Sequence, residues 1–365
     1  MREDQKKIMM ITSALSGGGA EKIFCWLSEK FRNNGYSVRV YSMLEPKDKK
    51  STENVIFLKW KSEKDYPGLI WKLKKEIDSW SPDIIIGWST LTNLAVVLAY
   101  KISRRTCKVV LCERSIVSET VLYANMAKRF LIKKLIKWLY PMADVIACNS
   151  ASASEDLIHA FSINLKKVVV VPNPVDTEMV KSKIADEPEE FKKITRPVML
   201  CVSRLSPEKG IIDLLETIAL KMKDVKGSFV IIGDGPMKDD CLARIDKYGL
   251  KDRVFLLGYR HEPYNYMHHA DLLILPSRHE GFPNVVLEGM AAGTAVVATE
   301  CCSNIVEMKN YGCCITAKVC DSEELAAAIR KGLSQSQKQL LIENADAFVC
   351  RFTPENVFEQ FCNLC

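Results

Sequence analysis

The sequence predicts an α/β protein of two Rossmann-like domains in tandem, each a parallel sheet covered by helices on both faces. Three observations support this. The chain has 365 residues and is therefore too long to fold around a single ordinary hydrophobic core. Short β-branched runs alternate with amphipathic stretches, and these runs are apolar throughout, as strands buried on both faces are. A charged stretch without strand character, residues 177–197, divides the alternation into two series.

The first series predicts an N-terminal domain over residues 1–176. Its expected strands are KIMMITS, SVRVYSM, NVIFLKW, DIIIGWS, KVVLCE, DVIACNS and KVVVVPN. The stretch EKIFCWLSEKFRNNG has helical spacing and closes on Gly35, a residue typical of helix ends. The most apolar long segment, DIIIGWSTLTNLAVVLAYKI, is interrupted by Ser, Thr and Asn, so we interpret it as a buried strand and helix, not a transmembrane span.

The second series predicts a C-terminal domain over residues 198–345. Its expected strands are VMLCVSR, SFVIIGD, RVFLLGY, DLLILPS, AVVATE and GCCITA. Residues 177–197 are interpreted as the linker between the domains. Residues 346–365 have helical character, and we expect this C-terminal helix to pack back on the first domain.

Composition narrows the class of function. The formal net charge is +6, which favours an anionic ligand or surface but falls short of a nucleic-acid binder. The 14 cysteines are scattered among apolar segments and no secretory signal is recognisable, so we expect reduced, mostly buried thiols and a cytoplasmic protein. Neither the five histidines nor the cysteine pairs have metal-ligand spacing, so we expect no metal and no cofactor.

Candidate binding residues of the second domain follow its expected strands. In open α/β sheets, ligands bind at the carboxyl ends of the strands. Arg204 and Lys209 lie in CVSRLSPEKG, and the glycines of IIGDGP, Gly233 among them, would let a ligand approach the backbone. Backbone near LLGYR, which holds Tyr259 and Arg260, is expected to contact a nucleotide base.

The stretch SRHEGFPNVVLEG places Glu280 and Glu288 eight positions apart around a turn and a helix start. Pro283 suits the first turn of a helix, which predicts outward-pointing amides just after it. These amides, at Asn284, Val285 and Val286, could bind a diphosphate together with Arg204 and Lys209. An ionised carboxylate only accepts hydrogen bonds, so its natural partner is a vicinal diol. The pattern therefore predicts a nucleotide-sugar site.

These motifs resemble those of the family 4 retaining glycosyltransferases. EGFPNVVLE resembles the family's E-x7-E motif, and SRLSPEKG, GDGP, LGY and AAGTAVVAT stand around it in the family's order. In the first domain, SGGGAEK and VPNPVD are similar to the family's glycine loop and P-N-G-V-D turn. The resemblance implies the GT-B fold, two Rossmann-like domains facing across a cleft. It extends to bacterial transferases that build lipid-linked oligosaccharides, including the N-acetylgalactosamine transferases of N-glycan assembly.

The resemblance also implies roles for individual residues. Arg204 and Lys209 would hold the diphosphate, Glu280 the donor-sugar hydroxyls and Glu288 the ribose, with Glu280, Arg204 and Lys209 as the catalytic set. The further implied substrate-binding residues are Gly17, Gly18, Gly19, Phe282, Pro283, Asn284, Val285, Gly233, Tyr259, Arg260, Asn173 and Arg114. Two departures leave the roles of Arg114 and Asn173 open: Arg114 stands where many relatives have His, and Pro174 replaces the Gly of P-N-G-V-D.

The expected activity is retaining transfer of a hexosyl or N-acetylhexosaminyl group from a nucleotide-sugar, with UDP favoured, to a polyprenyl-diphosphate-linked glycan in cell-surface polysaccharide or glycan biosynthesis. One alternative is a nucleotide-sugar epimerase of similar fold, and another is an inactive nucleotide-binding partner of a transferase. A dinucleotide-binding G-x-G-x-x-G motif would need Gly where Lys22 stands, which disfavours a dehydrogenase. The resemblance implies no required metal.

The stretch KRFLIKKLIKWLY, residues 128–140, reads as a basic amphipathic helix. Such helices bind membrane interfaces, which would make the protein peripheral on the inner face of the cytoplasmic membrane. Two alternatives remain open from the residues. The helix could pack its apolar side on the first domain and leave its lysines solvated, or its basic residues could bind the diphosphate of the acceptor.

Overall fold

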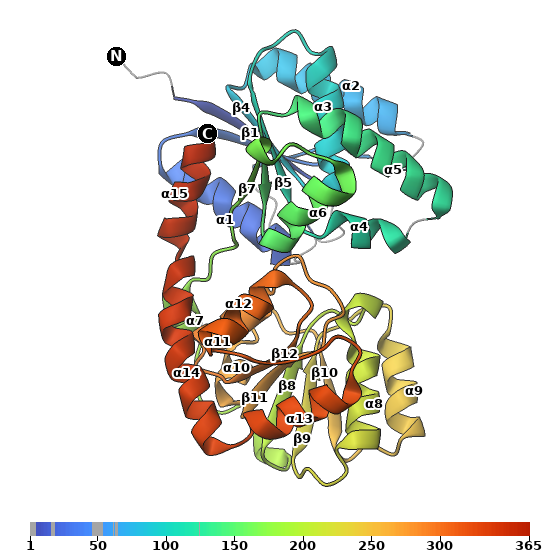
Figure 1. Cartoon of the computed structure of the whole chain (residues 1–365). Coiled ribbons are helices and arrows are strands. Elements are labelled where there is room, and N and C mark those ends of the chain that lie inside the picture. The colour runs from blue at the N-terminus through green and yellow to red at the C-terminus, as the bar shows by residue number, and fades with distance from the viewer. Residues whose placement is uncertain (1–4, 16–18, 46–53, 61, 63–64, 124) are drawn as a thin grey trace. The chain divides into compact units, whose positions relative to one another are not determined.

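The computed structural model describes residues 5–15, 19–45, 54–60, 62, 65–123 and 125–365. The chain forms two compact units (Figure 1). Unit 1 contains Met1–Asn173 and Glu355–Cys365, and unit 2 contains Pro174–Pro354. The two tandem Rossmann-like domains predicted from the sequence are confirmed.

Within the described residues, unit 1 is built on a 7-stranded sheet in the order β3-β2-β1-β4-β5-β6-β7. All its neighbouring strands are parallel. The strands are β1 (Lys7–Thr12), β2 (Ser37–Ser42), β3 (Val55–Phe57), β4 (Ile84–Trp88), β5 (Lys108–Glu113), β6 (Val145–Cys148) and β7 (Val168–Val170). The strand order reverses between β1 and β4, the position at which doubly wound sheets bind ligands.

Helices cover both faces of the unit 1 sheet, because successive side chains of each strand point to opposite sides. In β1, for example, Met9 and Ile11 join one hydrophobic cluster, whereas Ile8 and Met10 join another. The helices are α1 (Gly19–Asn33), α2 (Tyr66–Trp80), α3 (Thr90–Ile102), α4 (Val117–Thr120), α5 (Met126–Leu139), α6 (Ala151–Phe161) and α15 (Pro354–Leu364).

The C-terminal helix α15 packs beside α1 in unit 1 (Figure 1). Val357 and Phe361 are buried there, and the ring of Phe358 lies 5.2 Å from that of Phe31. An ion pair of 3.1 Å joins Lys30 to Glu355. The end of the chain therefore completes the hydrophobic core of the unit that the beginning of the chain forms.

Unit 2 is built on a 6-stranded parallel sheet, order β10-β9-β8-β11-β12-β13. The strands are β8 (Val198–Val202), β9 (Ser228–Ile232), β10 (Val254–Gly258), β11 (Leu272–Leu275), β12 (Val296–Thr299) and β13 (Ile315–Ala317). The helices are α7 (Thr177–Ser182), α8 (Ile211–Lys221), α9 (Lys238–Lys247), α10 (Tyr264–His269), α11 (Asn284–Ala291), α12 (Ser303–Tyr311), α13 (Ser322–Gly332) and α14 (Gln335–Val349). Here the strand order reverses between β8 and β11.

Residues 177–197, expected from sequence to be a linker, are part of unit 2. Val180 on α7 is fully buried and Phe191 is 2% exposed, and both belong to a hydrophobic cluster of this unit. Arg196 is paired with Asp271, at 2.8 Å. The charges and prolines of this segment suggested a linker, but its few apolar residues are spaced to contact the sheet.

Candidate functional site

Loops of unit 2 pack tightly against one another at the carboxyl edge of its sheet. A Cβ on Gly233 would lie 1.8 Å from the carbonyl oxygen of Ser203, and one on Gly210 would lie 2.0 Å from that of Pro276. Because backbone of the neighbouring loop fills the place of a side chain, only glycine fits at either position. From the sequence, Gly233 was expected to let a ligand approach the backbone. Close packing of the loops after β8 and β9 is a second reason for this glycine, and it shows only in the fold.

Glu280 and Lys209 form a nearly buried ion pair at this edge. Glu280 follows β11 and is 9% exposed. The ammonium nitrogen of Lys209 lies 2.7 Å from Oε1 and 2.8 Å from Oε2 of Glu280, and the hydroxyl of Ser277 donates to Oε1 at 2.7 Å. From the sequence, Lys209 was expected to bind a diphosphate and Glu280 a sugar, as separate contacts. The structure joins the two side chains into one unit.

Arg204 lies on the loop that follows β8 and points into solvent, with its side chain 68% exposed. Its guanidinium donates to Glu208 at 2.7 Å and to the hydroxyl of Ser206 at 3.3 Å. Burial raises the pKa of Glu208, but the hydrogen bonds from Ser206 and Arg204 outweigh this effect and lower that pKa to about 2. Glu208 was not predicted as a site residue, because its contact with Arg204 depends on the path of the loop after β8.

The start of α11 differs from the expectation of free amides. Pro283 precedes the helix as its N-cap, so it does not lie within the first turn. The amide of Asn284 donates to the carbonyl of Phe282 at 3.0 Å, and the amide of Val286 donates to that of Pro283 at 3.0 Å. The expectation that these two amides lack partners was therefore wrong, because the carbonyls of the turn just before the helix accept their hydrogen bonds.

Two other expected residues around α11 have distinct environments. The side chain of Phe282 is 6% exposed and its ring lies 6.0 Å from that of Phe352, so this side chain belongs to the core. Glu288 and Val285 are both half-buried on α11. The negative charge of Glu288 acts on the Tyr264 hydroxyl. Burial first, and then Glu288, raise the pKa of Tyr264.

Tyr259 and Arg260 follow β10. Tyr259 is 56% exposed, whereas Arg260 is tied to the body of unit 2. The guanidinium of Arg260 donates to the Tyr266 hydroxyl at 3.3 Å and to the Glu190 carboxylate at 3.3 Å. Since Glu190 lies in the segment that was expected to be a linker, Arg260 connects this segment to the edge of the sheet.

In unit 1, the expected glycine loop is only partly visible. Gly17 and Gly18 lie outside the described residues, and Gly19 begins α1. The indole nitrogen of Trp88 donates to the carbonyl of Ala20 at 3.0 Å. The start of α1 therefore lies beside the end of β4, where the strand order of the sheet reverses.

Arg114 and Asn173, the two residues with open roles, contact each other. The guanidinium of Arg114 donates to Oδ1 of Asn173 at 3.2 Å and lies 3.9 Å from the ring centre of Trp88. Its Nε and Nη2 atoms are buried and have no hydrogen-bond partner within the part of the chain that the structure describes. Phe361 of α15 lies on the same guanidinium, at 5.6 Å. Two guanidinium nitrogens with unpaired N–H groups are thus held beside Trp88, at the strand-order reversal of unit 1.

Glu113, which stands with Arg114 where many relatives have a His, is a buried acid to which no role was assigned from the sequence. It is fully buried and accepts hydrogen bonds from Tyr140, from Asn93 at 2.8 Å and from Thr90 at 3.0 Å. Burial raises the pKa of Glu113 to about 7, even though all three donors favour the charged form. This residue therefore titrates near neutral pH at the carboxyl end of β5.

Comparisons with known proteins decide the family. The family model described as Glycosyltransferase Family 4 matches residues 17–179, and that described as Glycosyl transferases group 1 matches residues 182–348. The chain is 30% identical over 310 residues to the N-acetylgalactosamine-N,N'-diacetylbacillosaminyl-diphospho-undecaprenol 4-alpha-N-acetylgalactosaminyltransferase of Campylobacter jejuni, covering 81% of each chain. This chain belongs to glycosyltransferase family 4.

A further relative of this chain is also named as a sugar transferase, and solved structures share its fold. It is 29% identical over 195 residues to the Escherichia coli UDP-Gal:alpha-D-GlcNAc-diphosphoundecaprenol alpha-1,3-galactosyltransferase, over 50% of each chain. Among solved structures, HepE of Anabaena in complex with UDP-glucose superimposes with a TM-score of 0.82 and 22% identity, covering 98% of each chain. WaaG, a glycosyltransferase of lipopolysaccharide biosynthesis, gives a TM-score of 0.78 at 17% identity, covering 98% of this chain and 99% of WaaG. The fold is GT-B, as the sequence analysis expected.

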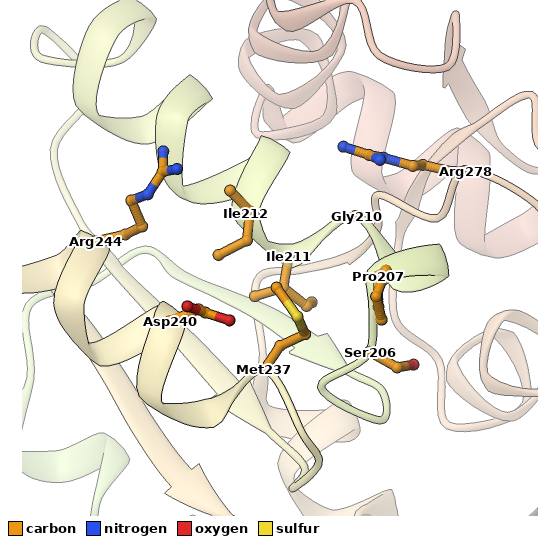
Figure 2. A pocket seen from close by; sticks show the side chains of 9 residues that line it. All are labelled: Ser206, Pro207, Gly210, Ile211, Ile212, Met237, Asp240, Arg244 and Arg278. Carbon is orange, nitrogen blue, oxygen red and sulfur yellow. The ribbon is translucent and has the colours of Figure 1, made fainter. Parts of the chain in front are cut away.

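The glycosyltransferase has a cavity of about 280 Å³ in unit 2, shown in Figure 2. Ser206 and Gly210, from the loop that also carries Arg204 and Lys209, line it together with residues of α8 and α9. Asp240 points into the cavity in Figure 2. None of the expected site residues lines it. The cavity therefore borders the loop of the candidate site without containing the candidate residues.

One face of α5 is unusually apolar for a solvent-exposed surface. Ile132, Ile136 and Leu139 pack into the core of unit 1. This agrees with the alternative in which α5 packs an apolar side on the first domain. A second apolar set on α5 remains exposed, namely Met126 (87%), Phe130 (64%), Leu131 (56%) and Trp138 (62%). Exposed lysines are interspersed with this set, and Lys134 lies 5.0 Å from the ring centre of Phe130. Packing on unit 1 explains only the first set.

The described residues contain neither a membrane-spanning helix nor a metal-binding cluster. No helix there is both long enough and apolar enough to cross a bilayer. No group of three or more His, Cys, Asp or Glu side chains in that part of the chain has an arrangement suited to a metal ion. All 14 cysteines of the glycosyltransferase are free thiols, as expected, and most are buried.

Proposed function

We propose that the chain is a retaining glycosyltransferase that moves a hexosyl or N-acetylhexosaminyl group from a UDP-sugar to a polyprenyl-diphosphate-linked glycan. The observation that carries this proposal is the Lys209–Glu280 pair, held at 2.7 Å beside the loop of the exposed Arg204. The relatives from Campylobacter jejuni and Escherichia coli are named for diphospho-undecaprenol-linked sugars, and HepE was solved with UDP-glucose. Cell-surface polysaccharide or glycan biosynthesis is the corresponding process.

We assign the leaving diphosphate to Arg204 and Lys209. The ammonium of Lys209 has three N–H donors, of which Glu280 takes two, so one remains for a phosphate oxygen. Arg204 is exposed and brings a planar donor fork. As the sugar–oxygen bond breaks, negative charge develops on the diphosphate, and fixed cations stabilise it without delivering a proton. Such a site has no requirement for a metal ion.

We assign the donor sugar to Glu280. Its Oε1 accepts from Ser277 and Lys209, whereas among the described residues Oε2 accepts from Lys209 alone, which leaves Oε2 able to accept a sugar hydroxyl. We assign the ribose to Glu288 and the base to backbone near Tyr259 and Arg260. The backbone of Phe282, Pro283, Asn284 and Val285, and Gly233, would complete this part of the site.

We assign substrate binding on unit 1 to Gly17, Gly18, Gly19, Arg114 and Asn173. Arg114 supports this assignment because two of its buried guanidinium nitrogens lack partners in the described part of the chain. Leaving such donors without acceptors is costly. A phosphate or sugar oxygen bound there would satisfy them.

We also propose that α5 binds the surface of an anionic membrane, at the inner face of the cytoplasmic membrane where a polyprenyl-linked acceptor would lie. Exposed aromatic and aliphatic side chains mixed with lysines are typical of interfacial helices. Phe130 and Trp138 would enter the headgroup region, and Lys134 and Lys137 would bind lipid phosphates.

The donor is tested by thermal unfolding with excess UDP, GDP or ADP, each with and without EDTA. A ligand at about 100 times its dissociation constant stabilises the folded chain by about 2.7 kcal/mol. We expect stabilisation by UDP that survives EDTA. Stabilisation by GDP alone would assign a different donor, and loss of the UDP effect with EDTA would contradict metal independence.

The activity is tested with Glu280→Ala and the matched control Glu323→Ala, because the Glu323 side chain is 71% exposed. Each variant is assayed for sugar transfer from UDP-hexoses to diphospho-polyprenol-linked glycans. We expect Glu280→Ala to lose transfer while still binding UDP, and the control to act like the parent. Donor turnover without an acceptor would favour the epimerase. UDP binding with no turnover of any donor would favour the inactive partner.

The membrane proposal is tested by sedimentation with vesicles of phosphatidylglycerol or of phosphatidylcholine. The double variant Phe130→Ser/Trp138→Ser should lose binding to the anionic vesicles. Leu220→Ser is the control, because Leu220 is a comparably exposed leucine (59%) on α8 of unit 2. Equal binding of all three proteins would refute the assignment to α5.

A further inference from the structure

Asn304 in unit 2 has a side-chain oxygen that is buried and unpaired. The residue is 8% exposed, and its Oδ1 atom accepts no hydrogen bond in the part of the chain that the structure describes. Leaving a buried amide oxygen without a donor costs free energy, so folded chains normally pair it. This oxygen is therefore suited to accept a hydrogen bond from a ligand.

Asn304 lies at the carboxyl edge of the unit 2 sheet. It is in the first turn of α12, a helix of 9 residues that follows β12. Asn304, Ile305 and Met308 are buried on one side of this helix, whereas Lys309 and Asn310 are exposed. The side chain of Asn304 therefore points inward, at the end of α12 that lies nearest the candidate site.

The loop that leads into α12 packs against the loop that carries Glu280. Because β11 and β12 are neighbouring parallel strands, the loops that follow them meet at the same edge. The amide of Glu280 donates to the carbonyl of Cys301 at 3.4 Å. The Thr299 hydroxyl donates to the carbonyl of Ser277, whose own hydroxyl donates to Glu280. The first turn of α12, with Asn304, is thus held beside the residue that we assign to the donor sugar.

The neighbours of Asn304 are apolar. Cys302 and Ile305 lie close to it in the sequence and belong to a hydrophobic cluster that also contains Phe282. Phe282 follows shortly after Glu280, so the same cluster supports both loops. A ligand group that reaches Asn304 must therefore offer a hydrogen-bond donor to the oxygen and an apolar part to the cluster.

An acetamido group meets both requirements. Its N–H donates to a neutral amide oxygen, and its methyl group is apolar. A ring hydroxyl also donates a hydrogen bond, but it brings no apolar surface to the cluster. A fully ionised phosphate has no donor, so the diphosphate is a poor partner for this oxygen. The ring hydroxyls of the sugar remain suited to the carboxylate of Glu280.

We propose that Asn304 is a specificity-determining residue for the donor sugar, and that its Oδ1 accepts a hydrogen bond from the acetamido N–H of an N-acetylhexosamine. This inference rests on the proposed function, because it takes the donor sugar to lie at Glu280. It narrows that function by selecting N-acetylhexosamine over hexose. Glu280 and Asn304, from the loops after neighbouring strands, then hold the hydroxyls and the acetamido group of one sugar.

The first measurement compares donors on the unaltered full chain. Calorimetry gives its affinities for UDP, UDP-N-acetylglucosamine, UDP-N-acetylgalactosamine, UDP-glucose and UDP-galactose. We expect at least one N-acetylated donor to bind about tenfold tighter than the hexose donor of the same configuration, the effect of one hydrogen bond. Equal affinity within both pairs of donors would overturn the proposal.

Three variants assign the preference to Asn304. Asn304→Leu keeps the branched shape of the side chain but removes its oxygen, so it should lose the preference for the N-acetylated donor and bind UDP like the parent. Asn304→Asp retains an acceptor oxygen and should keep the preference. Asn310→Leu is the matched control, because Asn310 is an exposed asparagine of the same helix, and it should also keep the preference. An undiminished preference in Asn304→Leu would refute the assignment.

Thermal unfolding without ligand distinguishes a ligand contact from a structural one. An oxygen without a partner adds no hydrogen bond to the folded chain, so Asn304→Leu should not lower the unfolding temperature. A lower unfolding temperature with an equal loss of affinity for UDP and for every donor would make Asn304 structural. UDP binding without any donor preference refutes only the role of Asn304. If the parent binds no uridine nucleotide, the proposed function fails, and the role of Asn304 fails with it.

Discussion

Replacing Lys209 by Met is the most direct test of the Lys209–Glu280 pair. Methionine keeps an unbranched apolar stem but removes the ammonium, which leaves the carboxylate of Glu280 nearly buried with Ser277 as its remaining side-chain donor among the described residues. The side chains of Lys209 and Glu280 are 22% and 10% exposed, so solvent screens the pair only weakly. Breaking a buried pair from one side costs about 3–5 kcal/mol. We take the lower limit, about 3 kcal/mol, because the pair is not fully enclosed.

A second variant distinguishes the cost of leaving one charge unpaired from the cost of losing the ion pair as a whole. Glu280→Gln in the Lys209→Met background removes the unpaired charge and keeps a group that can accept from Ser277. We expect the double variant to recover about 2 kcal/mol of the loss, because removing both charges is far less costly than removing one. Lys238→Met is the matched control, since its pair with Asp234 is 3.5 Å long and about half exposed. That control should change stability by less than about 0.5 kcal/mol.

The assay is urea unfolding followed by circular dichroism and by tryptophan fluorescence. All six tryptophans lie within residues 1–173, so their fluorescence follows unit 1 and not the unit that carries Lys209. The Lys209→Met shift is therefore expected in the circular-dichroism transition beyond any shift in fluorescence. If Lys209→Met costs no more than Lys238→Met, the ion pair does not hold Glu280 and our account of the site is wrong.

Three further predictions concern single residues. Arg204→Ala should raise the dissociation constant of UDP at least about tenfold, because it removes charge-assisted hydrogen bonds. It should change the unfolding free energy by less than about 0.5 kcal/mol, because this side chain is 68% exposed. Unchanged UDP affinity in calorimetry would contradict the assignment of Arg204 to the diphosphate. Glu113 has a folded-state pKa of about 7 against an ordinary value of 4.5, so the native state binds more protons than the unfolded state between these values and stability falls as pH rises. Relative to Glu113→Gln, the parent should lose about 3 kcal/mol from pH 4 to pH 8 in urea unfolding, and parallel curves would refute this. Arg114→Met should lower sugar transfer by at least about tenfold with a stability loss below about 1 kcal/mol, because the guanidinium atoms Nε and Nη2 have no partner among the described residues; a large stability loss with normal turnover would make Arg114 structural.

Local signals in the sequence carried much of the candidate site. Strand ends could be located because apolar runs stop abruptly, and parallel strands place all such ends at one edge. Arg204, Lys209 and Glu280 were therefore expected near one another before their distances were known. The spacing of Glu280 and Glu288 likewise follows from one short turn and helix.

Contacts between segments that are distant in the sequence could not be predicted from the local motifs. Lys209 and Glu280 are 71 residues apart, and nothing in either motif indicates that the two side chains share two hydrogen bonds. The segment 177–197 looked like a linker because it is charged, but burial of Val180 and Phe191 depends on the sheet that they meet. Paired amides at the start of α11 depend on the path of a turn, which residue types do not specify.

The sequence by itself determined the two parallel sheets, the family motifs and the residue types at the strand ends, because these depend on periodicity and on short-range spacing. Only the tertiary structure decided which of these residues touch: the Lys209–Glu280 pair and the stacking of Arg114 on Trp88 at 3.9 Å. The physical reason is that each of these contacts joins loops from different strands. Their distances are set by how the sheet orders its strands, and a linear pattern does not contain that order.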